Sequence, residues 1–262
     1  MSVRIAVHGA CGRMGQRVVH NVVTDPSTTL ASALDAADHP LLGQDIGTIC
    51  GLGEKNVPVR ATLADNVDAI IDFSIPEPSM AIVREALARK IPIVVATTGH
   101  EKHQKEEILS ASKTIPVLMS ANLSLVVNLL FKLTAEAGKA LAGKDFDVEI
   151  IEHHHRFKAD SPSGTALRFA EIVENNMQQN HRQHGREGIV GERPRNEIGI
   201  HAIRAGDNVG QHTILFSTLG ESLELVHRSS SRDSYAKGAV AAAKFLVGKP
   251  AGLYSMGDVL GI

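Results

Sequence analysis

The stretch V-R-I-A-V-H-G-A-C-G-R-M-G, residues 3–15, decides the first part of the fold. Its apolar beginning predicts a buried strand, the glycines end that strand, and a helical pattern follows over residues 16–23. The glycines form a G-x-x-G-x-x-G variant of the dinucleotide fingerprint, with Ala10 where the usual pattern has its first glycine. Such glycines allow a tight turn and let the backbone approach a pyrophosphate at the helix N-terminus. A purely structural strand-to-helix turn uses glycine for the same steric reason, so the context has to decide between the two.

An acidic residue at the right distance supplies that context. Asp35 follows Gly15 by 20 residues, at the end of a second predicted strand over 29–34. A carboxylate there accepts hydrogen bonds from the adenosine ribose hydroxyls, so we expect this part of the chain to bind a dinucleotide. The same carboxylate repels a 2′-phosphate and Ala36 offers no compensating charge, although Arg13 could still meet one. We therefore expect NADH to be preferred and NADPH to be tolerated at most.

The pattern of strand, helix and strand continues to about residue 120. Apolar strand runs alternate with helical stretches, which is typical of a parallel α/β sheet. The strands are expected at 68–73, 91–97 and 115–120, with helices at 80–89 and 101–112. In such sheets ligands bind beyond the carboxyl ends of the strands. The strand-ending runs A-T-T-G (96–99) and S-A-N-L (120–123) are therefore expected to border the cofactor, although either could be a plain turn.

The second half of the chain has a different pattern. We expect a helix at 125–142, a strand at 146–152, a helix at 163–178, a long mobile loop at 180–197, an antiparallel meander of strands at 198–204, 212–218 and 223–227, and a last helix at 238–247. The predicted fold class is α/β: a Rossmann-like dinucleotide-binding domain plus an α+β domain with a mixed or antiparallel sheet for substrate and oligomerisation. The expected boundaries are 1–124 with 236–262 for the first domain and 125–235 for the second.

Composition excludes several classes of function. The formal net charge is only -2, so neither nucleic acid nor a membrane surface is an expected partner. Hydrophobic residues are 43% of the chain, which is ordinary for a globular protein. The two cysteines form no disulfide framework or zinc site, and no signal peptide or membrane span is visible. We therefore expect a cytoplasmic protein.

The most informative stretch is I-E-H-H-H-R-F-K-A-D-S-P-S-G-T-A, residues 151–166. Three histidines, an arginine and a lysine follow a predicted strand, and a turn after Glu152 would let His154 and His155 converge. Ser163 then opens a helix whose backbone N–H groups suit an anion. This combination favours carboxylate binding with proton transfer. Two other interpretations stay open here: a metal site, although the histidines lack helical i, i+4 spacing, and a solvated polar face.

The run H-H-R-F-K-A-D-S-P-S-G-T-A closely resembles the signature of the dihydrodipicolinate reductases, H-H-x-x-K-x-D-x-P-S-G-T-A. The resemblance covers the whole chain and includes G-A-C-G-R-M-G, I-D-F-S, A-T-T-G, S-A-N-L-S, I-G-I-H-A-I-R-A-G-D-N-V-G-Q-H-T, S-S-S-R-D-S-Y-A-K-G-A and G-L-Y-S-M-G-D-V-L-G. Three positions depart from the common pattern: Ala36, where some members carry arginine, Ala96, where glycine is common, and Ser161, where alanine is common.

The resemblance implies a reaction, a set of roles and an assembly. These enzymes reduce a cyclic imine dicarboxylate, formed as 4-hydroxy-tetrahydrodipicolinate loses water, to tetrahydrodipicolinate with NAD(P)H, in lysine and diaminopimelate biosynthesis. His154 is expected to donate a proton, Lys158 to act as a second acid, and His155, Gly164 and Thr165 to hold a substrate carboxylate. A homotetramer built through the sheets of the second domain is expected. The expected cofactor contacts are Gly9, Ala10, Cys11, Gly12, Arg13, Met14, Asp35, Ala96, Thr97, Thr98, Ser120, Ala121, Asn122 and Leu123.

Three other functions compete with the reductase. An amino-acid dehydrogenase would share the glycine loop but not the H-H-x-x-K…S-G-T run. A silent dinucleotide sensor would be expected to lose His154 or Lys158, and both are present. A metalloenzyme using the three histidines would be sensitive to chelators. Because function depends on the site rather than the fold, the run at 151–166 favours the reductase.

Overall fold

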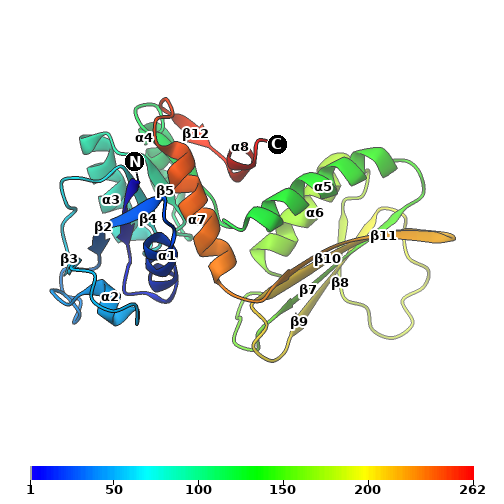
Figure 1. Cartoon of the computed structure of the whole chain (residues 1–262). Coiled ribbons are helices and arrows are strands. Elements are labelled where there is room, and N and C mark those ends of the chain that lie inside the picture. Colours follow the sequence, from blue (N-terminus) through cyan, green and yellow to red (C-terminus); the bar gives the residue numbers. More distant parts are fainter. Residues whose placement is uncertain (1) are drawn as a thin grey trace. The chain divides into compact units, whose positions relative to one another are not determined.

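The computed structural model describes residues 2–262, and these residues form two units (Figure 1). One unit consists of the chain up to Leu125 together with Arg232–Ile262, and the other is Val126–Ser231. The first unit is therefore discontinuous in sequence. Among the described residues, no helix is both long and apolar enough to cross a lipid bilayer.

A parallel sheet forms the centre of the first unit, with its strands in the order β12-β6-β5-β4-β1-β2-β3. Short apolar runs make these strands, and helices cover both faces of the sheet, as parallel sheets require. The strands are β1 (Val3–His8), β2 (Thr28–Leu34), β3 (Val59–Arg60), β4 (Ala69–Asp72), β5 (Ile93–Val95), β6 (Pro116–Met119) and β12 (Gly252–Tyr254). The order reverses between β1 and β4, which is where open α/β sheets bind their ligands.

Two helical layers cover the faces of this sheet. The helices are α1 (Arg13–Thr24), α2 (Ile46–Ile49), α3 (Pro76–Arg89), α4 (Lys102–Ala111), α7 (Asp233–Leu246) and α8 (Met256–Leu260). Alternate residues of β1 point to opposite faces, because side chains alternate along a strand. Ile5 and Val7 pack in one apolar core with residues of α1 and α7, whereas Ala6 packs in a second core with residues of α3 and α4. Each face of the sheet thus has its own core.

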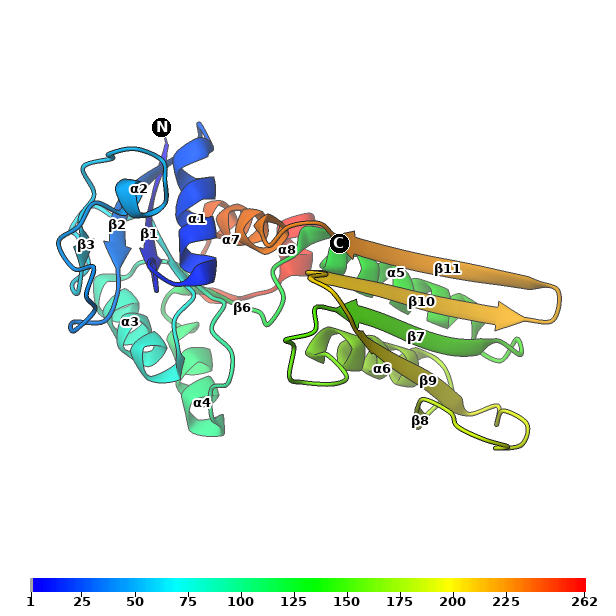
Figure 2. The same ribbon diagram turned by 90° about the horizontal axis from the view of Figure 1, so that it is seen from below.

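A mixed sheet and two helices make the second unit. Its strand order is β11-β10-β7-β9-β8, antiparallel from β11 to β7 and parallel from β7 to β8. The elements are α5 (Leu125–Leu141), β7 (Asp147–His154), α6 (Gly164–Asn176), β8 (His181–His184), β9 (Glu197–Arg204), β10 (Gly210–Thr218) and β11 (Glu221–Ser229). Figure 2 shows α5 and α6 on one side of these strands. One apolar core lies between them, with Phe169 and Phe216 fully buried.

The structure differs from the sequence predictions in three places of this unit. The expected three-stranded meander is wrong, because β7 lies between β9 and β10 and pairs with both. The stretch 180–197 is not all loop, since β8 adds a strand to the edge of the sheet. The expected turn after Glu152 is also wrong: β7 continues through His154. Strand alternation therefore places His153 and His154 on opposite faces of the sheet.

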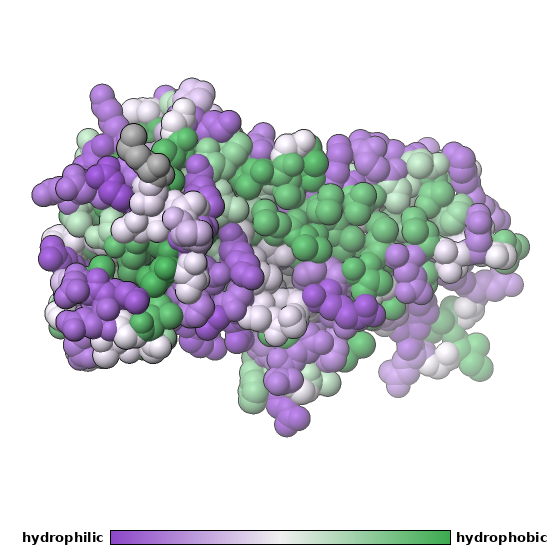
Figure 3. Space-filling view, viewed as in Figure 1, coloured by the Kyte–Doolittle hydropathy of each residue, from purple (hydrophilic) through white to green (hydrophobic). Residues whose placement is uncertain are grey.

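Apolar side chains also gather on the outside of the helical layer of the second unit (Figure 3). On α5, Val126, Leu129 and Leu133 are 55%, 41% and 43% exposed, although they are large and apolar. Their spacing places them along one stripe of the helix. The buried residues of α5, such as Val127 and Leu130, belong to the other stripe.

Candidate active site

The glycine loop between β1 and α1 is packed so tightly that side chains cannot be added at two of its glycines. A Cβ on Gly9, whose φ is +73°, would lie 2.5 Å from the carbonyl oxygen of Phe73 at the end of β4. A Cβ on Gly15 would lie 1.9 Å from the carbonyl oxygen of Gly9. At Gly12 the corresponding contact is 3.2 Å, and this residue is exposed. Gly9 and Gly15 therefore lie against neighbouring backbone, whereas Gly12 faces solvent.

The N-terminus of α1 is suited to an anion. Gly12 is its N-cap, and among residues 2–262 no side chain caps this helix. The first N–H groups of a helix have no partner within the helix, and its dipole makes this end positive. Arg13 is exposed beside them and Met14 is half-buried. These features suit the pyrophosphate of a dinucleotide, so the residues present fit such a cofactor.

Asp35 lies directly beside the glycine loop. Its carboxylate accepts hydrogen bonds from the backbone N–H of Cys11 at 2.9 Å and from that of Ala36 at 3.0 Å. The sequence did not predict a role for His39, which brings a ring nitrogen within 4.8 Å of an Asp35 oxygen and the Cys11 sulfur. Burial, and then the neighbouring Asp35, raises the pKa of the Cys11 thiol to about 12. The acidic partner that the sequence spacing pointed to is thus held against the loop.

Asp72, which the sequence reading left out of the site, connects the ends of three strands. It is fully buried at the end of β4 and accepts hydrogen bonds from His8 at 2.8 Å, Ser74 at 2.6 Å and Thr97 at 2.8 Å. Burial raises the pKa of the Asp72 carboxyl, but the interaction with His8 and the hydrogen bonds from serine side chains, Ser74 among them, together outweigh it and lower that pKa. Because the Thr97 hydroxyl is used here, its side chain supports the loop rather than facing outward.

The remaining expected cofactor residues lie at the ends of β5 and β6. Ala96 is buried after β5, whereas Thr98 is exposed. After β6 the loop is tied to itself, because the Ser120 hydroxyl donates to the carbonyl oxygen of Asn122 at 2.8 Å. Ala121 is exposed and Leu123 is buried under α7. The structure therefore gathers the expected residues at the carboxyl end of one sheet.

In the second unit, a buried carboxylate organises the polar cluster. Glu152, on β7, is fully buried and accepts a hydrogen bond from His154 Nδ1 at 2.5 Å. Arg204, on β9, donates to both of its carboxylate oxygens, at 2.7 and 2.8 Å. The backbone N–H of Ser163, which starts α6, donates to Glu152 at 3.0 Å. Two strands and the start of a helix are thus joined at one side chain.

The charges in this cluster follow from burial and hydrogen bonding. Burial raises the pKa of Glu152, but hydrogen bonds from His154, Arg204 and Ser163 outweigh it and lower that pKa to about 2. Burial, and then the neighbouring His154, lowers the pKa of His212 to about 3. At neutral pH, Glu152 is therefore ionised and His212 is uncharged.

The residues after His154 form a turn. His155 accepts a backbone hydrogen bond from Lys158, and its own N–H donates to the carbonyl oxygen of Asn208. Lys158 forms an ion pair with Asp160 at 2.8 Å, with 22% of the lysine side chain exposed. His153 points to the other face, where it lies 3.3 Å from the carbonyl oxygen of Ala205. The structure therefore separates His153 from the residues expected to act on substrate.

The start of α6 is the second helix N-terminus of interest. The Ser163 hydroxyl caps the helix by accepting from the backbone N–H of Ala166 at 3.2 Å. Gly164 is exposed and Thr165 is half-buried in the first turn. Because Ser163 also binds Glu152, this turn is next to His154. The first turn of α6 and His154 are therefore brought together through Glu152.

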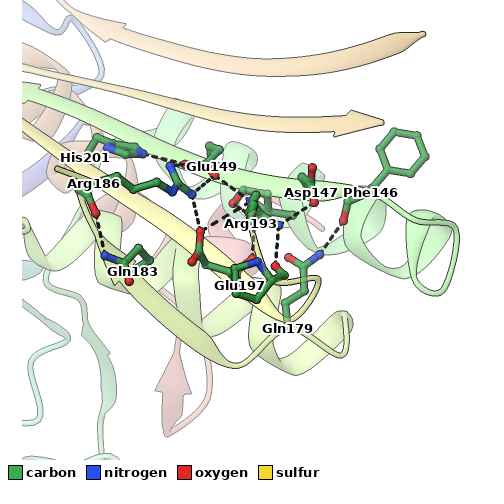
Figure 4. A network of polar contacts seen from close by, with 12 residues as sticks. Phe146, Asp147, Glu149, Gln179, Gln183, Arg186, Arg193, Glu197 and His201 are labelled. Carbon is green, nitrogen blue, oxygen red and sulfur yellow. Dashed lines mark hydrogen bonds and ion pairs between the residues drawn. The ribbon is translucent and has the colours of Figure 1, made fainter. Parts of the chain in front are cut away.

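A second polar network lies on the opposite face of the same sheet (Figure 4). Glu149 accepts from Arg186 at 2.7 Å, from Arg193 at 3.1 Å and from His201 at 2.7 Å. Burial raises the pKa of Glu149, but these hydrogen bonds lower it to about 2. Both arginines come from the stretch expected to be a mobile loop, and they also form ion pairs with Glu197. The network ties that stretch to the sheet.

Two family models match the chain in succession. The model described as dihydrodipicolinate reductase, N-terminus, matches residues 3–123, and the one described as dihydrodipicolinate reductase, C-terminus, matches residues 126–260. Together they cover almost the whole chain.

Full-length relatives and a solved structure agree with these matches. The 4-hydroxy-tetrahydrodipicolinate reductase of Hahella chejuensis is 47% identical, covering 99% of both chains. That of Rhodopirellula baltica is 46% identical over 99% of this chain and 96% of its own. The structure of a dipicolinate-bound dihydrodipicolinate reductase from Paenisporosarcina sp. TG-14 has a TM-score of 0.78 and 25% identity, covering 97% of this chain and 98% of its own.

Proposed function

The chain belongs to the dihydrodipicolinate reductase family, and we propose that it reduces 4-hydroxy-tetrahydrodipicolinate to tetrahydrodipicolinate, in lysine and diaminopimelate biosynthesis. Relatives that cover its full length carry the name of this activity. The observation that carries the proposal is the cluster around Glu152, which places His154 beside the first turn of α6. A reduced nicotinamide dinucleotide, when bound at the glycine loop, supplies the hydride.

The substrate would be held by positive groups of the second unit. We assign one substrate carboxylate to the first turn of α6, at Gly164 and Thr165, with His155 beside it. Backbone N–H groups at a helix N-terminus attract an anion without needing a charged side chain. The dipicolinate bound to the Paenisporosarcina enzyme is itself a dicarboxylate, which supports this assignment of substrate class.

Proton transfer is assigned to His154, with Lys158 as a second acid. Hydride addition to an imine leaves negative charge on the substrate, and nearby cationic groups stabilise that charge as it develops. Glu152 accepts a hydrogen bond from His154 Nδ1. When the ring is protonated, the hydrogen on Nε2 is therefore the one that it can give to the substrate. The ion pair with Asp160 keeps Lys158 close to the same turn.

The cofactor preference is assigned to Asp35. Its carboxylate is fixed by the backbone of the glycine loop, where it suits ribose hydroxyls and opposes a 2′-phosphate. We therefore propose that NADH is preferred. Arg13 and His39 are the nearby basic side chains through which NADPH would still be accepted.

We propose that the protein is a homotetramer that assembles through the open face of the second sheet. This face carries Glu149 and its ion pairs, and on it the apolar side chain of Ile203, which lies opposite His153, is 45% exposed. Light scattering after size-exclusion chromatography measures the assembly directly, and a monomeric mass would refute this part. Cys11 and Cys50 are both free, which fits the reducing cytoplasm as the place of action.

A coupled assay tests the reaction. Dihydrodipicolinate synthase, pyruvate and aspartate semialdehyde generate the unstable substrate in place, and loss of NADH or NADPH absorbance is followed separately. We expect oxidation that depends on both this protein and the substrate. His154→Ala should lower turnover by about 100-fold or more, the range for loss of a general acid, with NADH affinity unchanged.

His153→Ala is the matched control for that variant. His153 is the neighbouring histidine on the same strand, but it points to the opposite face of the sheet. We expect it to keep near-normal turnover. If both variants lose activity and NADH affinity together, the histidines serve folding instead. If NADH binds the wild type but is not oxidised, the proposed substrate is wrong.

A further inference from the structure

We propose that Glu152 is a positioning residue for His154: held by Arg204 and the start of α6, it fixes the proton on His154 Nδ1, turns Nε2 outward and stabilises the protonated ring. The inference rests on the proposed role of His154 as proton donor. Glu152 itself is fully buried, so it acts through the histidine rather than on the substrate.

The hydrogen bonds around Glu152 determine which nitrogen of His154 carries the proton. One carboxylate oxygen accepts from His154 Nδ1 and Arg204 Nη1, and the other accepts from Arg204 Nη2 and the Ser163 N–H. The arginine and backbone partners can only donate, so both oxygens must accept. A hydrogen on the oxygen that contacts Arg204 Nη2 and Ser163 would face two donors, and at neutral pH the pKa of Glu152, lowered to about 2, excludes one on the oxygen that contacts His154. Glu152 is therefore an anion, and Nδ1 of His154 must carry a hydrogen.

The order of the strands makes this arrangement rigid. In the parallel pairing of β7 with β9, His154 lies opposite Arg204. Arg204 also donates to the carbonyl oxygen of Asp160 at 2.7 Å, so one guanidinium holds both Glu152 and the turn that carries Lys158. Because Arg204 is planar and contacts both oxygens of Glu152, it fixes the orientation of the carboxylate as well as its charge.

Of the titratable groups around His154, Glu152 is the one whose negative charge balances a protonated ring. His212, on β10, meets the His154 ring edge-on at a centroid distance of 5.3 Å, and His227, on β11, stacks behind it at 6.1 Å. Burial keeps both of these histidines uncharged at neutral pH, since it lowers the pKa of each. Lys158 is positive but is paired with Asp160. Against a protonated His154, the carboxylate in hydrogen-bond contact is Glu152.

The decisive experiment replaces Glu152 by glutamine, which keeps the shape and removes the charge. An amide also presents a donor to one of the four donors that surround it, so the hydrogen bond to His154 is weakened or reversed. We expect kcat to fall about 10- to 100-fold. We also expect the high-pH limb of kcat/KM to move to lower pH by about one unit or more, because an anion in contact with a histidine favours its protonated form. NADH affinity should stay within about twofold, since Glu152 does not belong to the first unit.

Glu149→Gln is the matched control. Glu149 lies on the same strand, is bonded to arginine and histidine (Figure 4), and has its pKa lowered to about 2, as has Glu152. Strand alternation places it on the opposite face of the sheet. The control should lose stability without moving the pH limb. If Glu152→Gln lowers activity with an unmoved limb, Glu152 serves only folding and the inference fails.

A measurement on the wild type keeps the inference testable if Glu152→Gln does not fold. Nitrogen chemical shifts of ¹⁵N-labelled histidine report which ring nitrogen is protonated, and they need neither substrate nor turnover. We expect neutral His154 with its hydrogen on Nδ1, and hydrogen on Nε2 would overturn the inference. Failure of the proposed function is a separate result: the wild type would then leave NADH unoxidised, while these shifts still decide the position of the proton.

Discussion

Replacing Gly15 by alanine should damage the first unit by sterics alone. The added Cβ would lie 1.9 Å from the carbonyl oxygen of Gly9 and 2.8 Å from the Cα of Ala10, and ordinary contact begins at 3.4 Å. The glycine loop or α1 must therefore shift by about 1.5 Å, and both atoms that are struck belong to the backbone and cannot rotate away. Gly15 is inside α1, so its backbone conformation suits alanine, and only the steric contact of the added Cβ is unfavourable.

Overpacking of this kind costs about 1–3 kcal/mol of unfolding free energy. Urea unfolding followed by far-UV circular dichroism measures that loss, and NADH fluorescence measures binding. We expect Gly15→Ala to lower stability by that amount and to weaken NADH binding by about tenfold or more, because the displaced loop no longer presents its N–H groups.

Gly12→Ala separates the two effects. Its added Cβ would keep 3.2 Å from the carbonyl oxygen of Gly9 and would face outward. Because this contact is only about 0.2 Å short of ordinary contact, the variant should lose much less stability than Gly15→Ala and should still lose NADH affinity. Wild-type stability and NADH binding in Gly15→Ala would refute the packing argument for this loop.

Three further outcomes follow from the charges. Asp35→Asn should lower the ratio of kcat/KM for NADH to that for NADPH by about tenfold, and His39→Ala should reduce NADPH use alone; an unchanged ratio in the coupled assay would mean that the carboxylate does not select. Cys11, whose pKa burial raises to about 12, should resist iodoacetamide at pH 7.5 in the folded protein, and rapid labelling by mass spectrometry would contradict this. Glu149 has a pKa of about 2 in the folded protein against 4.5 when unperturbed, so it stabilises the fold above about pH 4.5 and loses that contribution as pH falls toward 2. Urea unfolding should therefore show a loss of roughly 3 kcal/mol of unfolding free energy across this range, and Glu149→Gln should lack this loss.

The sequence predicted the first unit well because its signals are local. Glycine spacing, a following helix and an acid at the end of the next strand all fall within a single β-α-β segment. Where signals conflict, the prediction was less accurate. Helix α3 begins at Pro76, four residues before the predicted start, because prolines suggest a loop although the first helical turn tolerates them. Strand β8 was missed because H-R-Q-H has no apolar alternation, and only pairing with β9 makes it a strand.

The organisation of the second site was not predictable in the same way. The stretch 151–166 pointed to His154 and to the start of α6, but Glu152 looked like a strand residue with no special role. Its partner Arg204 is distant in sequence and reaches it only because β9 pairs with β7. A sequence without sheet order gives no means of finding that pairing, and the predicted meander placed β9 beside the wrong strand. A charged residue at a buried position of a strand was the signal available, since such a residue requires a partner.

The discontinuity of the first unit has a consequence for how the protein is made. Helix α7 contributes buried residues such as Ala239, Ala243 and Leu246 to the core that also holds β1 and α1. During synthesis the N-terminal strands leave the ribosome first, but their core lacks the buried side chains of α7 until that helix has also been made. The contiguous second unit, Val126–Ser231, is complete before then. The part of the chain that is made first is thus the last that can finish folding, and its apolar surface stays exposed to solvent for longest.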